Sequence, residues 1–282
     1  MLKLPVIVLC ALFAVCGCSG SRNTSAVTSA PHGARIVSLM PSFTEDLVAI
    51  GAGRQIVAVD QFSTDVPGAR SLPVVANFSS VNTERIVQLH GSLIVAIPAQ
   101  DRFLVPLRRA GVQRALLTND SFGDIFRNIE ALGALTGHPR QAAALEKSLH
   151  ARTARLHASI HFRRAPTVFV VLDTSPIYTV GPKSYISDLI RLAGGRDAAA
   201  DLHAAYAPYS AEALLRLQPD VIITDKSTRL QRVLQTEPWK SLRAVAQRHV
   251  FTIDSADILE RPGPRYNEGL AWLVERLQRP AK

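Results

Sequence analysis

The stretch "HPRQAAALEKSLHARTARLHASIHFRR", residues 138–164, decides the fold because no strand pattern interrupts it. Its apolar residues recur at the helical period of about 100° per residue. The residues that fall near one face of such a helix are Ala142, Leu145, Leu149, Leu156 and Ile160. The pattern predicts one long helix that lies on other structure, and we assign residues 136–164 to this backbone segment.

Strands and helices alternate before this segment. The expected strands are "RIVSL" (35–39), "QIVAV" (55–59), "LIVAI" (93–97) and "QRALLT" (113–118). The expected helices are "SFTEDLVAIGAG" (42–53), "NTERIVQL" (82–89), "DRFLVPLRRAG" (101–111) and "SFGDIFRNIEALGALTG" (121–137). Such alternation favours a parallel sheet with helical crossovers, so residues 35–135 are predicted to form an α/β lobe.

The same alternation returns after the segment. The expected strands are "TVFVVLD" (167–173), "DVIIT" (220–224) and "HVFTI" (249–253). The expected helices are "SYISDLIRLAGG" (184–195), "SAEALLRL" (210–217), "PWKSLRAVAQ" (238–247) and "RYNEGLAWLVERLQ" (265–278). We therefore predict an α/β fold with two Rossmann-like lobes, the second over 165–282, whose parallel sheets are joined by one long backbone helix.

The N-terminus, "MLKLPVIVLCALFAVCGCSG" (1–20), has an uncharged stretch over residues 4–15. This is shorter than the roughly 20 residues that a membrane-spanning helix needs, and it fits a secretory leader. We assign 1–18 to a lipoprotein signal peptide and the small, polar residues 19–34 to a flexible tether.

The three cysteines, Cys10, Cys16 and Cys18, all lie in this leader. The mature body therefore has no disulfide, no catalytic thiolate and no cysteine zinc site. The letters "VCGC" (15–18) resemble the bacterial lipobox, which implies a lipid on Cys18 and a periplasmic location at a membrane. The alternative is a simple leader with incidental cysteines.

The formal net charge of +9 raises the question of nucleic acid. Lysines and arginines are spread along the chain without a dense run or interleaved aromatics, unlike a phosphate-binding surface. We expect no nucleic-acid partner.

Two facing α/β lobes favour a binding cleft, because ligands of open sheets lie beyond the carboxyl ends of the strands. Several aromatic residues follow strands or stand in loops, as the walls of a site for a bulky, partly apolar ligand would. They are Phe43, Phe62, Phe78, Tyr178, Tyr206 and Tyr209. Taken singly, each could equally be a core or rim aromatic.

Four segments together resemble the helical-backbone (class III) substrate-binding proteins of ABC importers, which serve vitamin B12, ferric siderophores and haem. They are "RIVSLMPSFTEDLVAIGAG" (35–53), "VANFSSVNTERIVQL" (75–89), "YSAEALLRLQPDVIIT" (209–224) and "ERPGPRYNEGLAWL" (260–273). The resemblance covers residues 35–279. It implies a monomeric, non-enzymatic lipoprotein without a cofactor, working with a permease dimer and a cytoplasmic ATPase, whose stiff helix allows only modest hinge closure.

The resemblance to vitamin B12 binders implies pocket roles for Phe78, Tyr178, Tyr206, Asp257 and Arg261, beside Phe43 and Phe62 from the pattern above. Those binders favour tryptophan at several such positions. Here Trp239 and Trp272 lie outside the matching motifs, and Ile97 stands where an aromatic residue is expected. A ferric siderophore is therefore an open alternative to a corrinoid, with Arg261 as a bidentate donor to an anionic chelate.

Residues 82–96 and 210–224 share one layout, in which a capping residue precedes a glutamate by two places. Glu84 and Glu212 could merely favour the helix macrodipole, by about 0.3 to 1 kcal/mol. The resemblance implies instead that each docks into an arginine pocket of the permease, one glutamate per lobe.

Two other classes of protein remain to be weighed. His150, His157 and His161 share a helix face and could bind a metal ion directly, but Arg152 and Arg155 lie nearby and that face has no carboxylate. An exported enzyme is the other rival; the sequence has no GxSxG, HExxH or Walker-type motif, although a spatial triad needs none.

Overall fold

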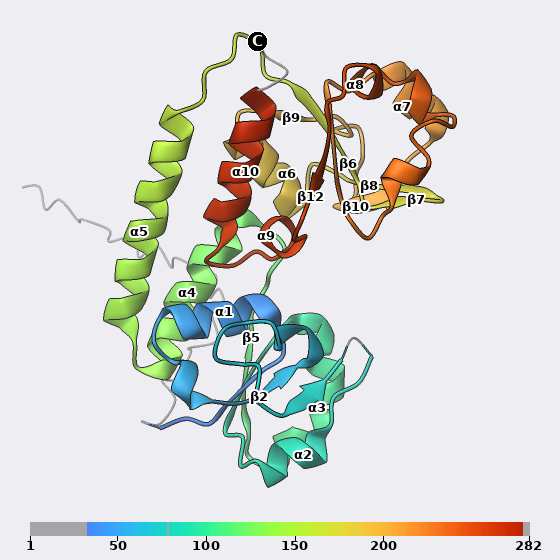
Figure 1. Cartoon of the computed structure of the whole chain (residues 1–282). Coiled ribbons are helices and arrows are strands. Elements are labelled where there is room, and N and C mark those ends of the chain that lie inside the picture. Colours follow the sequence, from blue (N-terminus) through green and yellow to red (C-terminus); the bar gives the residue numbers. More distant parts are fainter. Residues whose placement is uncertain (1–32, 78, 279–282) are drawn as a thin grey trace, which may run out of the picture.

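The computed structural model describes residues 33–77 and 79–278 of the chain, and Figure 1 shows two α/β lobes beside one long helix. The predicted fold class is confirmed. The leader, Cys18 and most of the tether lie outside the described residues, as does Phe78. Among the described residues, no helix is both long and apolar enough to cross a membrane.

The N-terminal lobe holds a five-stranded sheet in the order β3-β2-β1-β4-β5, with every pair parallel. Its strands are β1 (Ile36–Ser38), β2 (Ile56–Asp60), β3 (Val74–Ala76), β4 (Leu93–Ala96) and β5 (Gln113–Leu116). The helices are α1 (Pro41–Ala49), α2 (Thr83–Gln88) and α3 (Asp101–Arg108), with 3₁₀ turns η1 (Gly53–Gln55), η2 (Gln61–Ser63) and η3 (Pro98–Gln100). Strand β3 was not predicted.

Successive residues of these strands face opposite sides of the sheet. Val37 and Ile94 join a cluster with Ile86 of α2 and Leu104 of α3. Ile36, Leu93 and Val95 face the other way and join the main core with α1 and α4 (Phe122–Thr136). Helices therefore cover both faces, as the near-continuous apolar strands require.

The backbone helix is α5 (Pro139–Ala158), which lies antiparallel to α4 after the left-handed Gly137 at φ 78°. On its predicted face Ala142 and Leu149 are buried, and the other three residues pack partly buried against the core. The helix ends at Ala158, before the predicted end of its segment at 164. The chain turns there because Ile160 and Phe162 pack against Gly194 of the C-terminal lobe.

The C-terminal lobe has a four-stranded parallel sheet in the order β12-β11-β6-β9. Its strands are β6 (Thr167–Val171), β9 (Arg196–Asp197), β11 (Val221–Asp225) and β12 (Val250–Ile253). Around it lie α6 (Tyr185–Leu192), α7 (Ala211–Leu217), α8 (Arg243–Ala246), α9 (Asp257–Glu260) and α10 (Tyr266–Gln278). The turns η4 (Leu230–Arg232) and η5 (Trp239–Ser241) complete it.

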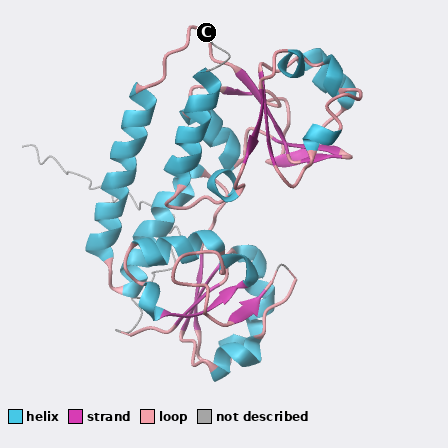
Figure 2. Cartoon of the chain, viewed as in Figure 1, coloured by secondary structure: helices cyan, strands magenta, loops and turns pink. Residues whose placement is uncertain are grey.

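Two details of this lobe differ from the prediction. A small antiparallel sheet, β7 (Asp173–Thr174), β8 (Ile177–Val180) and β10 (Tyr206–Pro208), adjoins the parallel one, as the strands in Figure 2 show. The helix expected over 238–247 is broken into η5 and α8 because Leu242 adopts an extended conformation and is fully buried.

Candidate ligand-binding site

A cavity of about 430 Å³ lies between the two lobes. Each of the five N-terminal strands leads into it, because the residue at or shortly after the carboxyl end of each strand lines the cavity. In chain order these residues are Leu39, Asp60, Asn77, Ile97 and Asn119. The cavity thus occupies the position where open α/β sheets bind ligands.

Aromatic side chains from both lobes form its walls. Phe62 and Phe103 come from the N-terminal lobe, and Tyr185 and Tyr206 come from the C-terminal lobe. Tyr206 is 45% exposed, whereas Tyr185 is 1% exposed. Large aromatic faces with a few polar groups suit a bulky ligand that is only partly polar.

Two buried polar atoms of this lining have no hydrogen-bond partner among the described residues: the hydroxyl of Tyr185 and Oδ1 of Asn119. Burial raises the pKa of Tyr185 well above its usual value, so its hydroxyl stays protonated and can donate. Asn119 donates through its amide to Ser42 Oγ at 2.9 Å, which leaves its carbonyl oxygen unused. Buried polar groups are normally paired, so these two atoms point to a ligand with matching groups.

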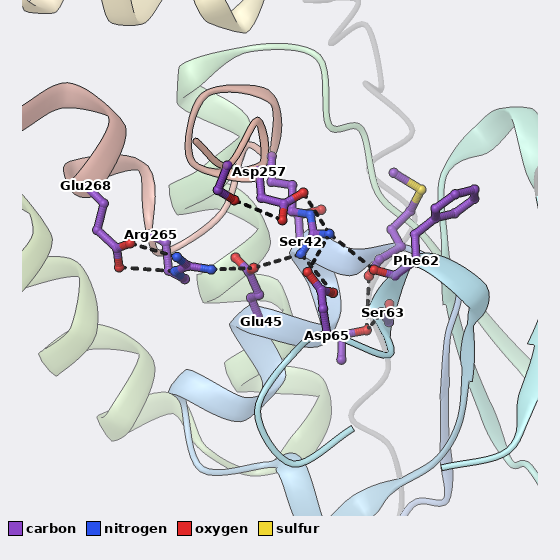
Figure 3. A network of polar contacts seen from close by, with 12 residues as sticks. Ser42, Glu45, Phe62, Ser63, Asp65, Asp257, Arg265 and Glu268 are labelled. Atoms are coloured by element: carbon purple, nitrogen blue, oxygen red, sulfur yellow. Dashed lines mark hydrogen bonds and ion pairs between the residues drawn. The ribbon is translucent and has the colours of Figure 1, made fainter. Parts of the chain in front are cut away.

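Arg261, at the end of α9, lines the cavity and ties the lobes together. Its guanidinium lies 2.9 Å from Asp257 of its own lobe. Across the cleft it lies 2.9 Å from Asp65 and 3.3 Å from Glu45 of α1, and it donates to the Phe62 carbonyl oxygen at 3.3 Å. We call Arg261 with Glu45, Asp65 and Asp257 the interlobe latch; Figure 3 shows this network.

The network continues to Arg265, which lies 3.7 Å from Glu45 and 2.7 Å from Glu268. Burial raises the pKa of Glu45, and the two arginines partly offset the rise. Burial acts against the charged form of Arg261, but the hydrogen bond to Asp65 and the nearby carboxylates raise its pKa overall. Arg261 is therefore a fully charged group whose charge is already matched by protein carboxylates.

The structure brings four of the seven expected ligand residues to the cavity: Phe62, Tyr206, Asp257 and Arg261. Phe43 does not line it. That side chain is fully buried in the main core because it lies on the inner face of α1. Tyr178 also lies elsewhere, in β8, opposite Pro208 and Asp173. Tyr209 is buried in the second core, with its hydroxyl 3.2 Å from Asp201.

Sequence reasoning missed Asn119, Phe103 and Tyr185. A signal existed for Asn119, because it follows β5 and residues beyond strand ends were expected at the site. Phe103 and Tyr185 lie near the starts of α3 and α6, where an aromatic residue reads like any core residue of an amphipathic helix. Nothing in the sequence marks them.

Glu84 and Glu212 each occupy the second position of a short helix, α2 and α7. Asn82 caps α2 by accepting from the Arg85 amide at 2.9 Å, and Ser210 caps α7 by accepting from the Ala213 amide at 2.9 Å. Both glutamates are exposed, and Glu212 forms an ion pair with Arg216. In Figure 1, α2 lies at the lower end of the N-terminal lobe and α7 at the outer edge of the C-terminal lobe, and both are remote from α5.

The histidines of the rival metal hypothesis have other surroundings. His150 stacks on Phe126 with ring centroids 4.2 Å apart and an interplanar angle of 10°. Among residues 33–77 and 79–278, no group of three or more His, Cys, Asp or Glu side chains could hold a metal ion.

Comparison with known proteins identifies a family that shares this architecture. Residues 36–256 match the family described as periplasmic binding protein. A Bacillus subtilis (strain 168) protein, the uncharacterized ABC transporter substrate-binding lipoprotein YvrC, is 29% identical over 253 residues, which cover 86% of this chain and 79% of that one.

Two solved structures share the fold over nearly the whole chain. The periplasmic vitamin B12 binding protein BtuF of Vibrio cholerae has a TM-score of 0.77 at 30% identity, covering 89% of this chain and 100% of that one. The periplasmic heme-binding protein RhuT from Roseiflexus sp. RS-1, in apo form, has a TM-score of 0.78 at 26% identity, covering 88% and 99%.

Proposed function

The chain belongs to the periplasmic binding protein family, and on this premise we propose that it captures a bulky corrinoid or ferric chelate between its lobes. It is a substrate-binding protein of an ABC transporter and not an enzyme, as its relatives are binding proteins of this kind. Because the names of the two solved relatives give vitamin B12 and heme as the ligands, they do not favour direct binding of a bare metal ion. The family places the protein in the periplasm or outside the cell.

One observation carries the choice of ligand class. The cavity between the lobes has aromatic walls and two buried polar atoms without partners, Tyr185 Oη and Asn119 Oδ1. Its volume of about 430 Å³ lies within the range of about 300 to 1,000 Å³ for ligand pockets. The named ligands of the relatives, vitamin B12 and heme, each contain a large, partly apolar ring system, which fits such walls.

A titration tests this proposal. The purified protein is titrated in a calorimeter with cyanocobalamin, haem and several ferric siderophores, and separately with Zn²⁺ and Mn²⁺. We expect saturable binding of at least one corrinoid or chelate. Binding of none of them, together with tight binding of a free metal ion, would refute the proposal in favour of the metal alternative.

We further propose that Glu84 and Glu212 dock the protein onto its permease. Both are exposed, one on each lobe, and each lies in the first turn of a capped helix that is remote from α5. Exposed charges of this kind mainly steer association. The partners are two permease subunits with a cytoplasmic ATPase, and the binding protein acts as a monomer.

Replacing both glutamates, Glu84→Ala with Glu212→Ala, should abolish ligand uptake by cells and leave ligand affinity within about twofold of the parent. The matched control is Glu130→Ala with Glu237→Ala, which removes two other exposed glutamates and should leave uptake unchanged. A large loss of ligand affinity in the docking variant, or equal loss of uptake in both, would contradict the docking role.

We propose that Cys18 carries the lipid that holds the protein at the membrane. The lipobox-like letters before it and the lipoprotein name of the Bacillus relative support this assignment. Cys18→Ala should release the protein into the soluble periplasmic fraction, whereas Cys16→Ala should leave it in the membrane fraction. Mass spectrometry of the mature N-terminus checks the modification directly.

A further inference from the structure

The lining of the interlobe cavity is acidic, although the chain as a whole carries a formal charge of +9. The carboxylates in the lining are Asp60, Asp257 and Glu260, and the guanidinium groups are Arg102 and Arg261. A ligand in a cleft responds to the charges that line it more than to the net charge of the surface. The question is therefore which of these charges are free to meet a ligand.

The positive charge of Arg261 is already paired with carboxylates of the protein. Its partners in the interlobe latch, Glu45, Asp65 and Asp257, lie at 3.3, 2.9 and 2.9 Å. The side chain of Arg261 is only 15% exposed, and that of Glu45 only 5%. An anionic ligand would have to compete with these carboxylates for the guanidinium, and displacing Glu45 would leave a buried charge unpaired.

Glu260 is the opposite case, a carboxylate of the lining without a partner. No described residue forms a hydrogen bond or an ion pair with it. Burial of its carboxyl group raises its pKa, the like charges of Asp225 and Asp257 raise it further, and the charge of Arg261 offsets part of the rise. Burial raises the pKa of the Tyr206 hydroxyl, and the negative charges of Glu260 and Asp120 raise it further. Both carboxylates therefore lie close enough to influence the cavity wall that Tyr206 forms.

Arg102 is the remaining cation of the described lining. It lies at the rim, exposed, with its guanidinium 4.6 Å from the centroid of the Phe103 ring. No described carboxylate pairs with it, so it offers one positive charge to a ligand. Against it stand the unpaired Glu260 and the three carboxylates of the latch, which outnumber the two arginines beside them, Arg261 and Arg265.

We propose that the cavity selects ligands with no net charge or a positive one, and discriminates against polyanionic chelates of similar size. This inference rests on the proposed function, which supplies the ligand class. The proposed site rests on the cavity and on the unpaired Tyr185 and Asn119 atoms. The carboxylates decide which members of the ligand class it accepts. An uncharged corrinoid or a cationic hydroxamate chelate satisfies them, and a ferric catecholate does not.

The test uses the full-length protein in detergent and isothermal calorimetry at constant pH. The probes are cyanocobalamin (uncharged), ferrioxamine B (a cationic hydroxamate chelate) and ferric enterobactin (a polyanionic catecholate chelate). We expect the uncharged or the cationic probe to bind at least about tenfold more tightly than the polyanion, a difference of about 1.4 kcal/mol. Equal or tighter binding of the polyanion would overturn the inference and leave the proposed function standing. Binding of no probe would overturn the inference, and the wider titration with haem and further siderophores would then decide on the proposed function.

A charge-neutral variant gives an independent readout. Glu260→Gln keeps the shape of the side chain, and we expect it to raise the affinity for the polyanion relative to the other probes by about three- to tenfold. Glu237→Gln, an exposed glutamate of the same lobe outside the cavity, should leave the affinity ratio at the parent value. An unchanged ratio in Glu260→Gln would overturn the role of Glu260.

Salt provides a second readout that needs no mutation. Added salt screens the repulsion between the cavity carboxylates and a polyanion. It should therefore narrow the difference in affinity between the polyanion and cyanocobalamin. Polyanion binding that weakens with salt would mean that the cavity attracts negative charge, and the inference would then be wrong.

Discussion

Asp46 is a buried carboxyl group without compensation. It lies in the middle of α1, fully buried, and neither of its carboxylate oxygens has a hydrogen-bond partner among the described residues. Burial raises its pKa well above the usual 3.8, and the neighbouring Glu45 raises it further. Holding the charged form of such a group inside the protein weakens the folded state.

We expect Asp46→Asn to stabilise the protein at pH 8 by about 1 to 3 kcal/mol. Because the carboxyl binds its proton more tightly in the folded state, the parent loses stability as pH rises from about 4 through the folded pKa. The variant should lack this loss, so its advantage should shrink at pH 5. Urea unfolding at both pH values measures it. Asp120→Asn, at an exposed aspartate, is the control, and equal effects of the two substitutions would contradict the prediction.

Sequence reasoning found part of the cavity lining and had physical grounds for missing the rest. Phe62, Arg261 and Asp257 stand in motifs or after strands, where a local signal exists. Phe43 carried the same kind of signal, yet it is core, because the rotation of a helix about its axis is set by packing and cannot be read from one residue. The partners of Arg261 in the N-terminal lobe are more than 190 residues away in the chain, so nothing in the sequence indicated that Arg261 joins the lobes.

Among the elements, α4 and α5 come into close contact at Gly133. A Cβ at this position would lie 2.5 Å from Ala142 Cβ and 3.2 Å from the His138 carbonyl oxygen. Neither neighbour is the end of a flexible side chain, so the two helices would have to move apart. The backbone helix is therefore seated on α4 through a contact that only glycine permits.

Gly133→Ala should lower the free energy of unfolding by about 1 to 3 kcal/mol, since overpacking outweighs the better helix propensity of alanine. Gly123→Ala in the same helix is the control. Its Cβ would meet only the end of the Arg127 side chain, at 3.1 Å, and Ser121 Oγ. We expect no loss of stability there. Thermal and urea unfolding of both variants decide the matter, and a loss of equal size in the control would count against the close contact.

The sequence predicted the long elements and missed the short ones. The runs that became β4, β6 and β11 are rich in β-branched residues and almost entirely buried, a pattern that two covered faces require. Strands β7 and β9 have two residues each. They exist because neighbouring strands pair with them, and so short a segment has no periodicity of its own to detect.

At the scale of the whole molecule, the lobes are held by more than one helix. A single apolar cluster runs from Ala34 to Leu277 and includes residues of α1, α4, α6 and α10. Gly263 also brings the chain beside α1, since a Cβ there would lie 3.2 Å from Glu45 Oε2. The predicted modest closure thus has a second physical basis, because moving the lobes would disturb a packed core as well as bend α5.

The interlobe latch leads to the last prediction. Arg261→Met removes the cation that compensates the buried Glu45, and we expect a loss of about 2 to 4 kcal/mol in the free energy of unfolding at pH 7. Adding Glu45→Gln should recover part of that loss, because the double variant leaves no unpaired charge in the interior. The pKa of Glu45 is already raised by burial, so without Arg261 this pKa should rise further. The single variant should therefore regain stability as pH falls toward 5, and the double variant should not.

Urea unfolding of the three variants, Arg261→Met, Glu45→Gln and the pair, forms a thermodynamic cycle. Strictly additive effects would mean that Arg261 and Glu45 act independently, and that the lobes are joined by the apolar cluster alone.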